Sequence, residues 1–298
     1  MADVSQHFVD IADMFLKLST DFATEAVFGQ STDSLLFDLR HWSGRQDKGS
    51  AGEFSNVLGY SLQMLGQRLQ LINFYWLRDS LKFRRSCRTC RAFVDKYLTE
   101  AQAEQKQDPK AGDPTGPVSF LSSIVARRKA STGVMRDQLL SLLLASRDTT
   151  ASFLSWTVYA LARHPQVTEK LRQIIHSRLP NARPPTTADI LALPYLRHVL
   201  NETLRIFPVV PVNGRTAVTD TVLPEGGGDD GKSPLAVPAG TKVAFVIYAM
   251  HRRRDVFGED ADEFKPERWE EPGAAPNGDF GGAFVPFILG PRVCLGST

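Results

Sequence analysis

Apolar residues recur three and four positions apart along the first two thirds of the chain, a spacing that places them on one face of a helix. The pattern covers residues 8–39 and is interrupted at 41–53 by a polar stretch rich in Gly and Ser. It resumes over 54–104, where the second predicted helix is long and basic on one face. The prolines and glycines of 105–117 cannot continue a helix, so this segment is predicted to be a hinge or an exposed loop.

The longest helical pattern runs from 135 to 163 and stops at His164-Pro165, because proline ends a helix. Two shorter helices are predicted at 168–178 and at 195–206.

The pattern changes after Pro208. Residues 209–222 and 237–249 are predicted strands, separated by a loop at 224–236 that is rich in Gly, Asp and Pro. The chain is therefore predicted to be mainly α with a small β portion.

Composition narrows the class of protein. A chain of 298 residues that is 42% apolar can bury the core of one large domain or two ordinary ones. The 35 basic and 33 acidic residues leave a net charge of +2, which gives no basis for nucleic-acid binding. Three cysteines cannot form a disulfide framework in a chain of this size, so a reducing compartment fits better. The longest apolar run is far shorter than the roughly 20 residues of a membrane span, and the N-terminus lacks the features of a secretory signal.

The centre of the long helix combines apolar and ionic residues. A nearly uniform apolar run, 139–145, is followed by Ser146, Arg147, Asp148 and Thr149. A helix that is apolar on all sides is typical of a protein interior, where an Arg and an Asp must be paired or face a functional cavity. The Thr149 hydroxyl can bond to the main-chain carbonyl four residues earlier. A structural Arg–Asp pair at one exposed turn remains the simpler alternative.

Glu202 and Arg205 lie three positions apart and share one face of a helix. Much later the chain reads Pro-Glu-Arg268-Trp. If Arg268 docks on the same carboxylate, two guanidinium groups clamp one glutamate and fix the local geometry. An ordinary surface pair is the alternative.

The strongest chemical signal is the cysteine loop at 286–296. Gly290 and Gly296 flank Cys294 and have no Cβ to keep backbone N–H groups away from the sulfur. Those donors, together with Arg292, favour a thiolate over a thiol. A buried, inert cysteine is the alternative.

This loop, FILGPRVCLG, resembles the haem-binding signature of the cytochromes P-450, Phe-x-x-Gly-x-Arg-x-Cys-x-Gly, at all five fixed positions. ETLR and PERW resemble that family's Glu-x-x-Arg helix and its downstream partner, and ASRDTT resembles its oxygen-activation motif. The segments TVLPEGGGDDGKSP and IYAMHRRRDVFGEDADEF look like the fungal branch that hydroxylates alkanes and fatty acids. The resemblance implies the cytochrome P-450 fold.

The resemblance also implies roles for individual residues. Cys294 would be the axial ligand of the iron in heme b (iron protoporphyrin IX), and a thiolate at that position favours O–O cleavage. Phe287 would pack beside it, with Gly290 and Gly296 shaping the loop. The remaining assignments are Arg292 and Arg215 on the haem propionates, Asp148 and Thr149 as the acid–alcohol pair that delivers protons, Glu202, Arg205 and Arg268 as a structural triad, and Val209, Val210 and Val212 at the substrate.

The implied activity is that of a haem-dependent monooxygenase acting on an apolar chain, an alkane or a fatty acid, with O2. Its electrons would come from NADPH through NADPH–cytochrome P-450 reductase. Members of the family act at the cytosolic face of the endoplasmic reticulum membrane. This chain shows no targeting or transmembrane segment, so residues 1–298 are expected to be a partial domain, the C-terminal portion of the fold. It would lack the anchor, the N-terminal part and the helix after the cysteine loop.

Two other hypotheses stay open. The chain could be a truncated, non-catalytic remnant that binds no haem, or a helical interaction module without a cofactor. Ser146 stands where the family usually has Gly, and its side chain could crowd or hydrate the oxygen-binding groove.

Three further motifs are set aside. Residues 226–233 match a phosphate-loop pattern, but Pro234 and Pro238 forbid the helix that should follow, so a glycine-rich loop between strands is expected. Cys87 and Cys90 match Cys-x-x-Cys without a second ligand pair, and are predicted to be half-buried cysteines of a helix. The basic run 251–254 is predicted to be a solvated loop.

Overall fold

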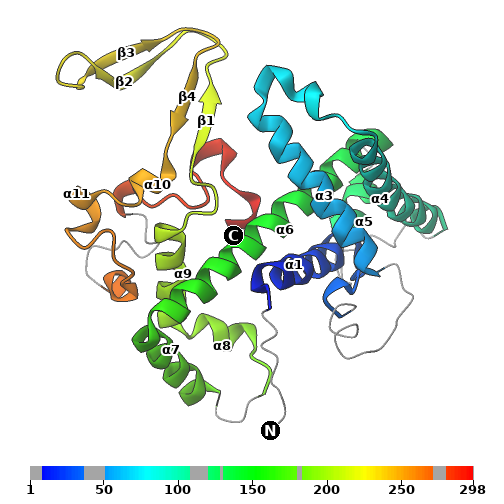
Figure 1. Ribbon diagram of the computed structural model, residues 1–298, viewed down its shortest axis with the longest axis horizontal. Coiled ribbons are helices and arrows are strands. Elements are labelled where there is room, and N and C mark those ends of the chain that lie inside the picture. Colours follow the sequence, from blue (N-terminus) through cyan, green and yellow to red (C-terminus); the bar gives the residue numbers. More distant parts are fainter. Residues whose placement is uncertain are drawn as a thin grey trace. The chain divides into compact units, whose positions relative to one another are not determined.

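The computed structural model describes residues 9–36, 51–107, 120–127, 130–179, 183–270 and 280–297. The chain forms two compact units, Met1–Ser155 and Trp156–Thr298, which are described separately. Helices dominate both, and the few short strands all lie in the second unit, at least in the ranges given above (Figure 1). The prediction of a mainly α fold with a small β portion is confirmed.

The first unit is helical throughout its described length. Its elements are α1 Ile11–Phe28, a helical turn at 34–36, α3 Ala51–Gln70, the 3-10 segment η1 Ile72–Arg78, α4 Leu81–Gln107, α5 Phe120–Arg127 and most of α6, Thr132–Arg163. Asp10 caps α1 by accepting from the main-chain N–H groups of Ala12 and Asp13, and Gly29 ends the helix at a φ of 79°. The polar break at 41–53 and the hinge at 105–117 lie largely outside the described residues.

The apolar faces of these helices meet in one core. Helix α4 packs against α3 and α5, and α5 packs against α1. Buried side chains from all five helices form the core: Val27, Phe28, Phe54, Leu58, Val94, Leu98, Leu121, Val125, Leu139 and Leu143. Cys87 and Cys90 lie on one helix, as predicted. Cys87 is partly exposed, but Cys90 is buried in this core instead of half-buried, because it packs among the apolar side chains of the neighbouring helices.

The second unit begins with the last turns of α6 and continues through helices. Helix α6 ends at Arg163, and Pro165 opens the next helix, which confirms the predicted stop. The helices are α7 Pro165–Arg178, α8 Thr187–Leu191, α9 Pro194–Ile206, α10 Ile247–Met250 and α11 Arg254–Phe257. The 3-10 turns are η2 Pro266–Glu270, η3 Phe280–Gly282, η4 Gly290–Arg292 and η5 Leu295–Ser297. A small core joins α7 and α9 through Val167, Leu171, Tyr195 and Val199.

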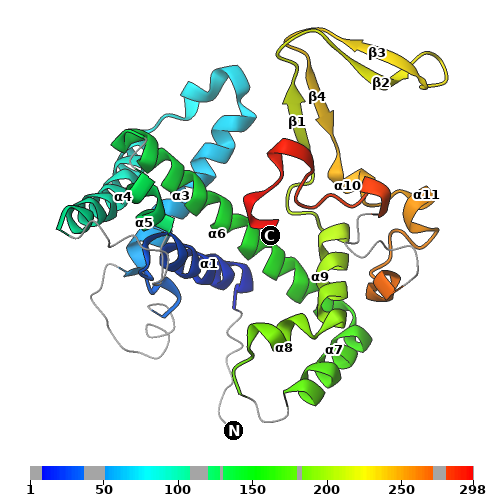
Figure 2. The ribbon, with the colours of Figure 1, turned by 180° about the vertical axis from the view of Figure 1, so that it is seen from behind.

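Two antiparallel strand pairs extend from these helices (Figures 1 and 2). Strand β1 Asn213–Thr216 pairs with β4 Lys242–Phe245, and β2 Thr221–Gly227 pairs with β3 Ser233–Val237. The predicted loop at 224–236 is therefore wrong in extent, because only 228–232 turn between paired strands. Gly228 and Gly231 supply the positive φ of this turn, and the phosphate-loop match lies in the hairpin, as expected of a loop between strands.

The predicted strand at 237–249 is also wrong at its end. It stops at Phe245, because Ile247–Met250 closes a helical turn instead of pairing. The predicted solvated loop at 251–254 is wrong for His251, whose side chain is completely buried. Arg253 and Arg254 are exposed and form ion pairs with neighbouring acidic residues.

Candidate functional site

The cysteine loop presents its sulfur to solvent. Cys294 is exposed, which excludes the inert, buried cysteine considered from the sequence. Its main-chain N–H donates to the Phe287 carbonyl at 2.9 Å, and the N–H of Val293 donates to the Gly290 carbonyl at 3.0 Å. These bonds close a compact turn around the thiol.

The two glycines of the loop have different physical requirements. Gly290 adopts a φ of 78°, a conformation that side chains rarely tolerate, although a Cβ there would meet nothing within 4 Å. At Gly296 a Cβ would lie 3.8 Å from the Cys294 sulfur, an ordinary contact distance. Glycine is therefore favoured at position 290 by the backbone conformation. At position 296 a side chain would only just contact the sulfur.

Arg215 and Arg292 come together at one cleft of about 640 Å³, lined mainly by β1 and β4. Lys242 lines the same cleft, and the described residues around it include no acidic side chain. Arg215 bonds to the Gly214 carbonyl at 2.7 Å and to Asn213 Oδ1 at 3.2 Å. Three cations without a carboxylate suit an anionic group such as a propionate. Sequence reasoning missed Lys242, which strand register places directly opposite Thr216.

Apolar side chains surround the exposed sulfur on the same loop. Phe287, Leu289, Val293 and Leu295 are exposed, with fractions between 40% and 84%. Such side chains ordinarily bury their surface, and a flat apolar macrocycle would cover it. The thiol, the apolar loop and the cationic cleft therefore fit a haem carrying two propionates.

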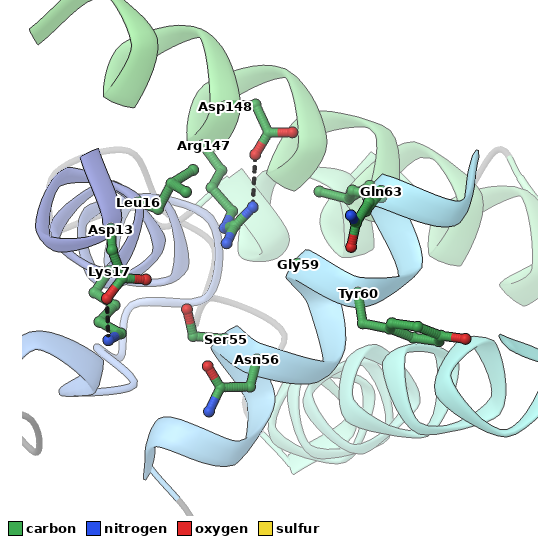
Figure 3. A pocket seen from close by; sticks show the side chains of 11 residues that line it. Asp13, Leu16, Lys17, Ser55, Asn56, Gly59, Tyr60, Gln63, Arg147 and Asp148 are labelled. Carbon is green, nitrogen blue, oxygen red and sulfur yellow. Dashed lines mark hydrogen bonds and ion pairs between the residues drawn. The ribbon is translucent and has the colours of Figure 1, made fainter. Parts of the chain in front are cut away.

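The turn of α6 that contains Arg147 and Asp148 lies in the first unit (Figure 3). The Arg147 side chain is buried, donates from Nη1 to Asp148 Oδ1 at 2.6 Å, and donates from Nε to Thr20 Oγ1 at 2.9 Å. The Asp148 side chain is 42% exposed, so part of its carboxylate reaches solvent. Thr149 donates its hydroxyl to the Ala145 carbonyl at 2.6 Å, the bond expected from the sequence.

A cleft of about 450 Å³ reaches this turn between α1, α3 and α6. Gly59 of α3 faces Arg147, since a Cβ at Gly59 would lie 3.2 Å from the guanidinium. The hydroxyl of Ser146 bonds to the Leu142 carbonyl at 2.8 Å and is therefore satisfied by its own helix. The predicted effect of Ser146 on an oxygen-binding groove stays a prediction.

Glu202 is the centre of a fully buried ionic cluster in the second unit. Arg205 donates to both of its carboxylate oxygens at 2.8 Å, and Arg268 Nε donates to Oε1 at 3.2 Å. The main-chain N–H of Lys265 and the indole N–H of Trp269 add bonds of 2.9 and 3.0 Å. The predicted clamp of two guanidinium groups on one glutamate is confirmed, with Trp269 as an additional donor.

Arg205 and Arg268 extend the cluster to three stretches of main chain. Arg205 donates to the carbonyls of His251, Ala261 and Glu263. Arg268 donates to the Phe257 carbonyl and to Asp260, whose pKa is lowered mainly by its hydrogen bond from Lys265 and further by Arg268. The cluster thus holds the irregular chain between α10 and η2, which has few regular hydrogen bonds of its own.

Comparison with known proteins decides the family. The sequence model of the family described as cytochrome P-450 matches residues 2–298. The chain belongs to the cytochrome P-450 family. A cytochrome P-450 of Arthroderma benhamiae is 37% identical over 97% of this chain and 56% of that protein. Cytochrome P-450 52A13 of Debaryomyces hansenii is 39% identical over 97% of this chain and 55% of that protein.

A third relative is the cytochrome P-450 monooxygenase g430 of a Fusarium species, 39% identical over 97% of this chain and 50% of that protein. The chain thus spans about half the length of the curated relatives it matches. None of the helices among the described residues is long and apolar enough to cross a membrane.

Proposed function

We propose that this chain is the haem-binding, thiolate-ligating part of a monooxygenase, with Cys294 as the axial ligand of the iron. The observation that carries the proposal is the exposed Cys294 thiol on a loop whose Arg292 shares a cationic cleft with Arg215. A buried sulfur, or arginines directed to separate surfaces, would not suit a haem. The prediction that residues 1–298 form a partial domain belongs to the same proposal.

The cleft would bind the propionates of the haem, and the cysteine loop would contact its ring and its iron. Arg215 and Arg292 would hold the propionates as charge-assisted hydrogen-bond donors, and Lys242 would add a third positive charge. Phe287 would cover the ring beside the sulfur, while the turn at Gly290 sets the direction of the thiol. When bound, heme b supplies activation of O2 with electrons that come from NADPH through a reductase.

Asp148 and Thr149 would handle protons on α6. Asp148 Oδ1 accepts from Arg147, which leaves Oδ2 as the oxygen that takes up or releases a proton. The Thr149 hydroxyl donates to the Ala145 carbonyl, so its oxygen can still accept a hydrogen bond. Together they would deliver protons from solvent, since both Asp148 and Thr149 are at least partly exposed.

An alkane or a fatty acid is the proposed substrate, attacked near its end. The valines predicted to touch it, Val209, Val210 and Val212, all precede β1, and Val212 also lines the cationic cleft. Apolar side chains there match a hydrocarbon chain. NADPH–cytochrome P-450 reductase is the proposed partner and the cytosolic face of the endoplasmic reticulum membrane the proposed location.

Haem titration tests the binding proposal. We expect saturable uptake of one haem per chain, and about tenfold weaker binding in Arg215→Gln and in Arg292→Gln, since each loses a charge-assisted bond. Arg253→Gln is the matched control, because Arg253 is exposed and pairs only with its neighbour Asp255. Absence of uptake by the wild-type chain would favour the non-catalytic remnant, and unchanged uptake in both cleft variants would refute the propionate assignment.

Product analysis tests the reaction. The haem-loaded chain, reductase and NADPH are supplied with fatty acids and n-alkanes of increasing length, and hydroxylated products are measured by mass spectrometry. We expect a hydroxylated product whose yield depends on chain length and falls in Asp148→Asn. Haem uptake without any oxygenated product would separate cofactor binding from catalysis.

A further inference from the structure

His251 lies between the Glu202 cluster and the approach to the cysteine loop. Its side chain is completely buried. Its Nε2 accepts the main-chain N–H of Val285 at 2.9 Å, and its own carbonyl accepts from Arg205 Nη1 at 2.9 Å. One residue thus bonds to the ionic cluster through its main chain and to the segment before the loop through its side chain.

Val285 leads directly into the loop. It lies two residues before Phe287, whose carbonyl accepts the N–H of Cys294 at 2.9 Å. Val285 itself is buried, with 7% of its surface exposed, and the ring of neighbouring Phe284 lies 5.1 Å from the imidazole. Water cannot easily replace an acceptor at such a site, so an unpaired Val285 N–H would cost free energy.

The hydrogen bond fixes the protonation of the imidazole. Nε2 accepts, so it carries no proton, and the single proton of the neutral ring is on Nδ1. No acceptor meets full hydrogen-bond geometry at Nδ1 among the residues that the structure describes, although the main-chain carbonyls of Leu204 and Arg205 interact with the ring. A second proton could only be added at Nε2. The protonated Nε2 and the Val285 N–H would then be two donors facing each other, so the hydrogen bond between them would be lost.

The charged groups around the ring oppose protonation as well. The pKa of His251 is lowered from 6.5 to about 4, mainly by burial. Hydrogen bonding to the main-chain carbonyls of Leu204 and Arg205 opposes this shift, and the charges of Arg205 and Arg252 add to it. Glu202 pairs with Arg205, and Asp262 lies 3.7 Å from Arg252, so these acids offset part of the positive charge.

We propose that His251 is a positioning residue that holds the cysteine loop through Val285, and that only its neutral form can do so. Acid would then release the loop by turning its acceptor into a donor. The consequence for haem retention rests on the proposed function, whereas the hydrogen bond and its release can be tested without a cofactor.

The direction of the pH effect follows from the two states of the ring. In the closed loop the pKa of His251 is about 4, and in an opened loop it returns toward 6.5. Between these values protons bind the open state better, so opening becomes favoured by about tenfold per pH unit as the pH falls. Above pH 6.5 the ring is neutral in both states, so the equilibrium between the closed and the open loop no longer depends on the protonation of His251.

Amide hydrogen exchange at Val285, followed by NMR on the cofactor-free chain, tests the proposal. After correction for the chemical exchange rate, we expect wild-type protection to fall about tenfold per pH unit from pH 6.5 to 4. His251→Gln keeps an acceptor and cannot titrate, so its protection should be independent of pH. His251→Leu removes the acceptor, and Val285 should be poorly protected at every pH.

His164→Gln is the matched control, since it makes the same substitution at a histidine whose Nδ1 bonds to the Ala160 carbonyl and whose ring packs on Phe264, with no hydrogen bond to Val285 among the described residues. It should retain the wild-type slope. A flat wild-type profile, or the wild-type slope in His251→Gln, would overturn the proposal. The wild-type and His251→Gln profiles decide the question even if His251→Leu does not fold.

Haem dissociation provides the second measurement. Transfer of haem to an apo-globin acceptor should accelerate in wild type as the pH falls from 6.5 to 4, and should accelerate less in His251→Gln. If no variant takes up haem, the proposed function fails while the exchange result still stands. If haem leaves both chains with the same pH profile although exchange differs, the extension from loop to cofactor is wrong.

Discussion

Two buried arginines, Arg205 and Arg147, each pair with a carboxylate of the same helix, and the two pairs differ in almost every other respect. Arg205 and Glu202 are both fully buried, and Glu202 accepts bonds from two arginines, an indole and a main-chain N–H. Arg147 is buried as well, but its partner Asp148 is 42% exposed. The first carboxylate is surrounded by donors, whereas the second is partly accessible to water.

The difference shows that one kind of ion pair can be fully enclosed in one unit and open to solvent in the other, and the proposed proton delivery by Asp148 depends on that opening. A buried pair whose carboxylate accepts several hydrogen bonds fixes the chain around it, and removing one partner is costly. A pair that is open on one side keeps its carboxylate positioned and reactive. Glu202→Gln and Asp148→Asn test this comparison directly. Two further tests, acid and a substitution at Ile288, concern other parts of the second unit, and all four are taken from the largest expected effect to the smallest.

Glu202→Gln should have the largest effect. It leaves the buried guanidinium of Arg205 without its counter-charge and leaves Arg268 with Asp260 as its remaining acidic partner, so the free energy of unfolding of the second unit should fall by about 3–5 kcal/mol. Urea unfolding followed by tryptophan fluorescence measures the change. Glu267→Gln is the control from the neighbouring motif, because Glu267 and its partner Lys170 are 38% and 41% exposed and should contribute less than about 1 kcal/mol. Equal effects of the two substitutions would contradict the assigned role of Glu202.

Acid should weaken the second unit in two steps. Because the pKa of His251 is lowered to about 4, stability is complete above pH 6.5 and falls by about 1.4 kcal/mol per pH unit below it, about 3 kcal/mol in all. Asp260 also has a lowered pKa, so its contribution is lost only as the pH falls below 3.8. Thermal unfolding between pH 8 and 3 tests this, and His251→Gln should abolish the first step alone.

Asp148→Asn should cost much less stability than Glu202→Gln, about 1 kcal/mol, because water can approach the exposed side of the pair. The same unfolding measurement, followed on the first unit, gives the value. Thr20→Val removes the other acceptor of Arg147 and is the matched comparison. A loss of 3 kcal/mol or more in Asp148→Asn would make Asp148 a structural residue like Glu202.

Ile288→Gly should have the smallest effect, and in the stabilising direction. Ile288 has a φ of 65°, which a β-branched side chain adopts only under strain of about 1–3 kcal/mol. Glycine removes that strain but increases chain entropy in the unfolded state, so a net gain of about 0.5 kcal/mol is expected. Leu289→Gly is the control, since Leu289 has an ordinary φ of −124° and should lose stability. Thermal unfolding of the second unit that shows a loss for both variants would argue against strain at Ile288.

Sequence reasoning succeeded where a pattern is local. Helical spacing located α6, α7 and α9, and Glu-x-x-Arg with its downstream arginine identified the clamp on Glu202, because these signals depend on a few residues of one segment. It failed at the strand ends, where β2 continues to Gly227, which pairs with Ser233 although glycine normally signals a loop. The pairing partner decides such cases, and it lies elsewhere in the chain.

His251 shows the other limit. In the sequence it opens a basic run, which favours a solvated loop, yet the fold buries it against Val285 and Phe284, more than thirty residues later. Lys242 at the cationic cleft was missed for the same reason. Positions that depend on contacts distant in the sequence carry no signal in the spacing of neighbouring residues.

The carbon monoxide spectrum of the reduced, haem-loaded chain tests most directly whether Cys294 binds iron. We predict a strongly red-shifted Soret band that Cys87→Ala retains and Cys294→Ala abolishes, because only a thiolate ligand produces that shift. A red-shifted band that survives in Cys294→Ala, or haem uptake by the wild-type chain without such a band, would contradict the assignment.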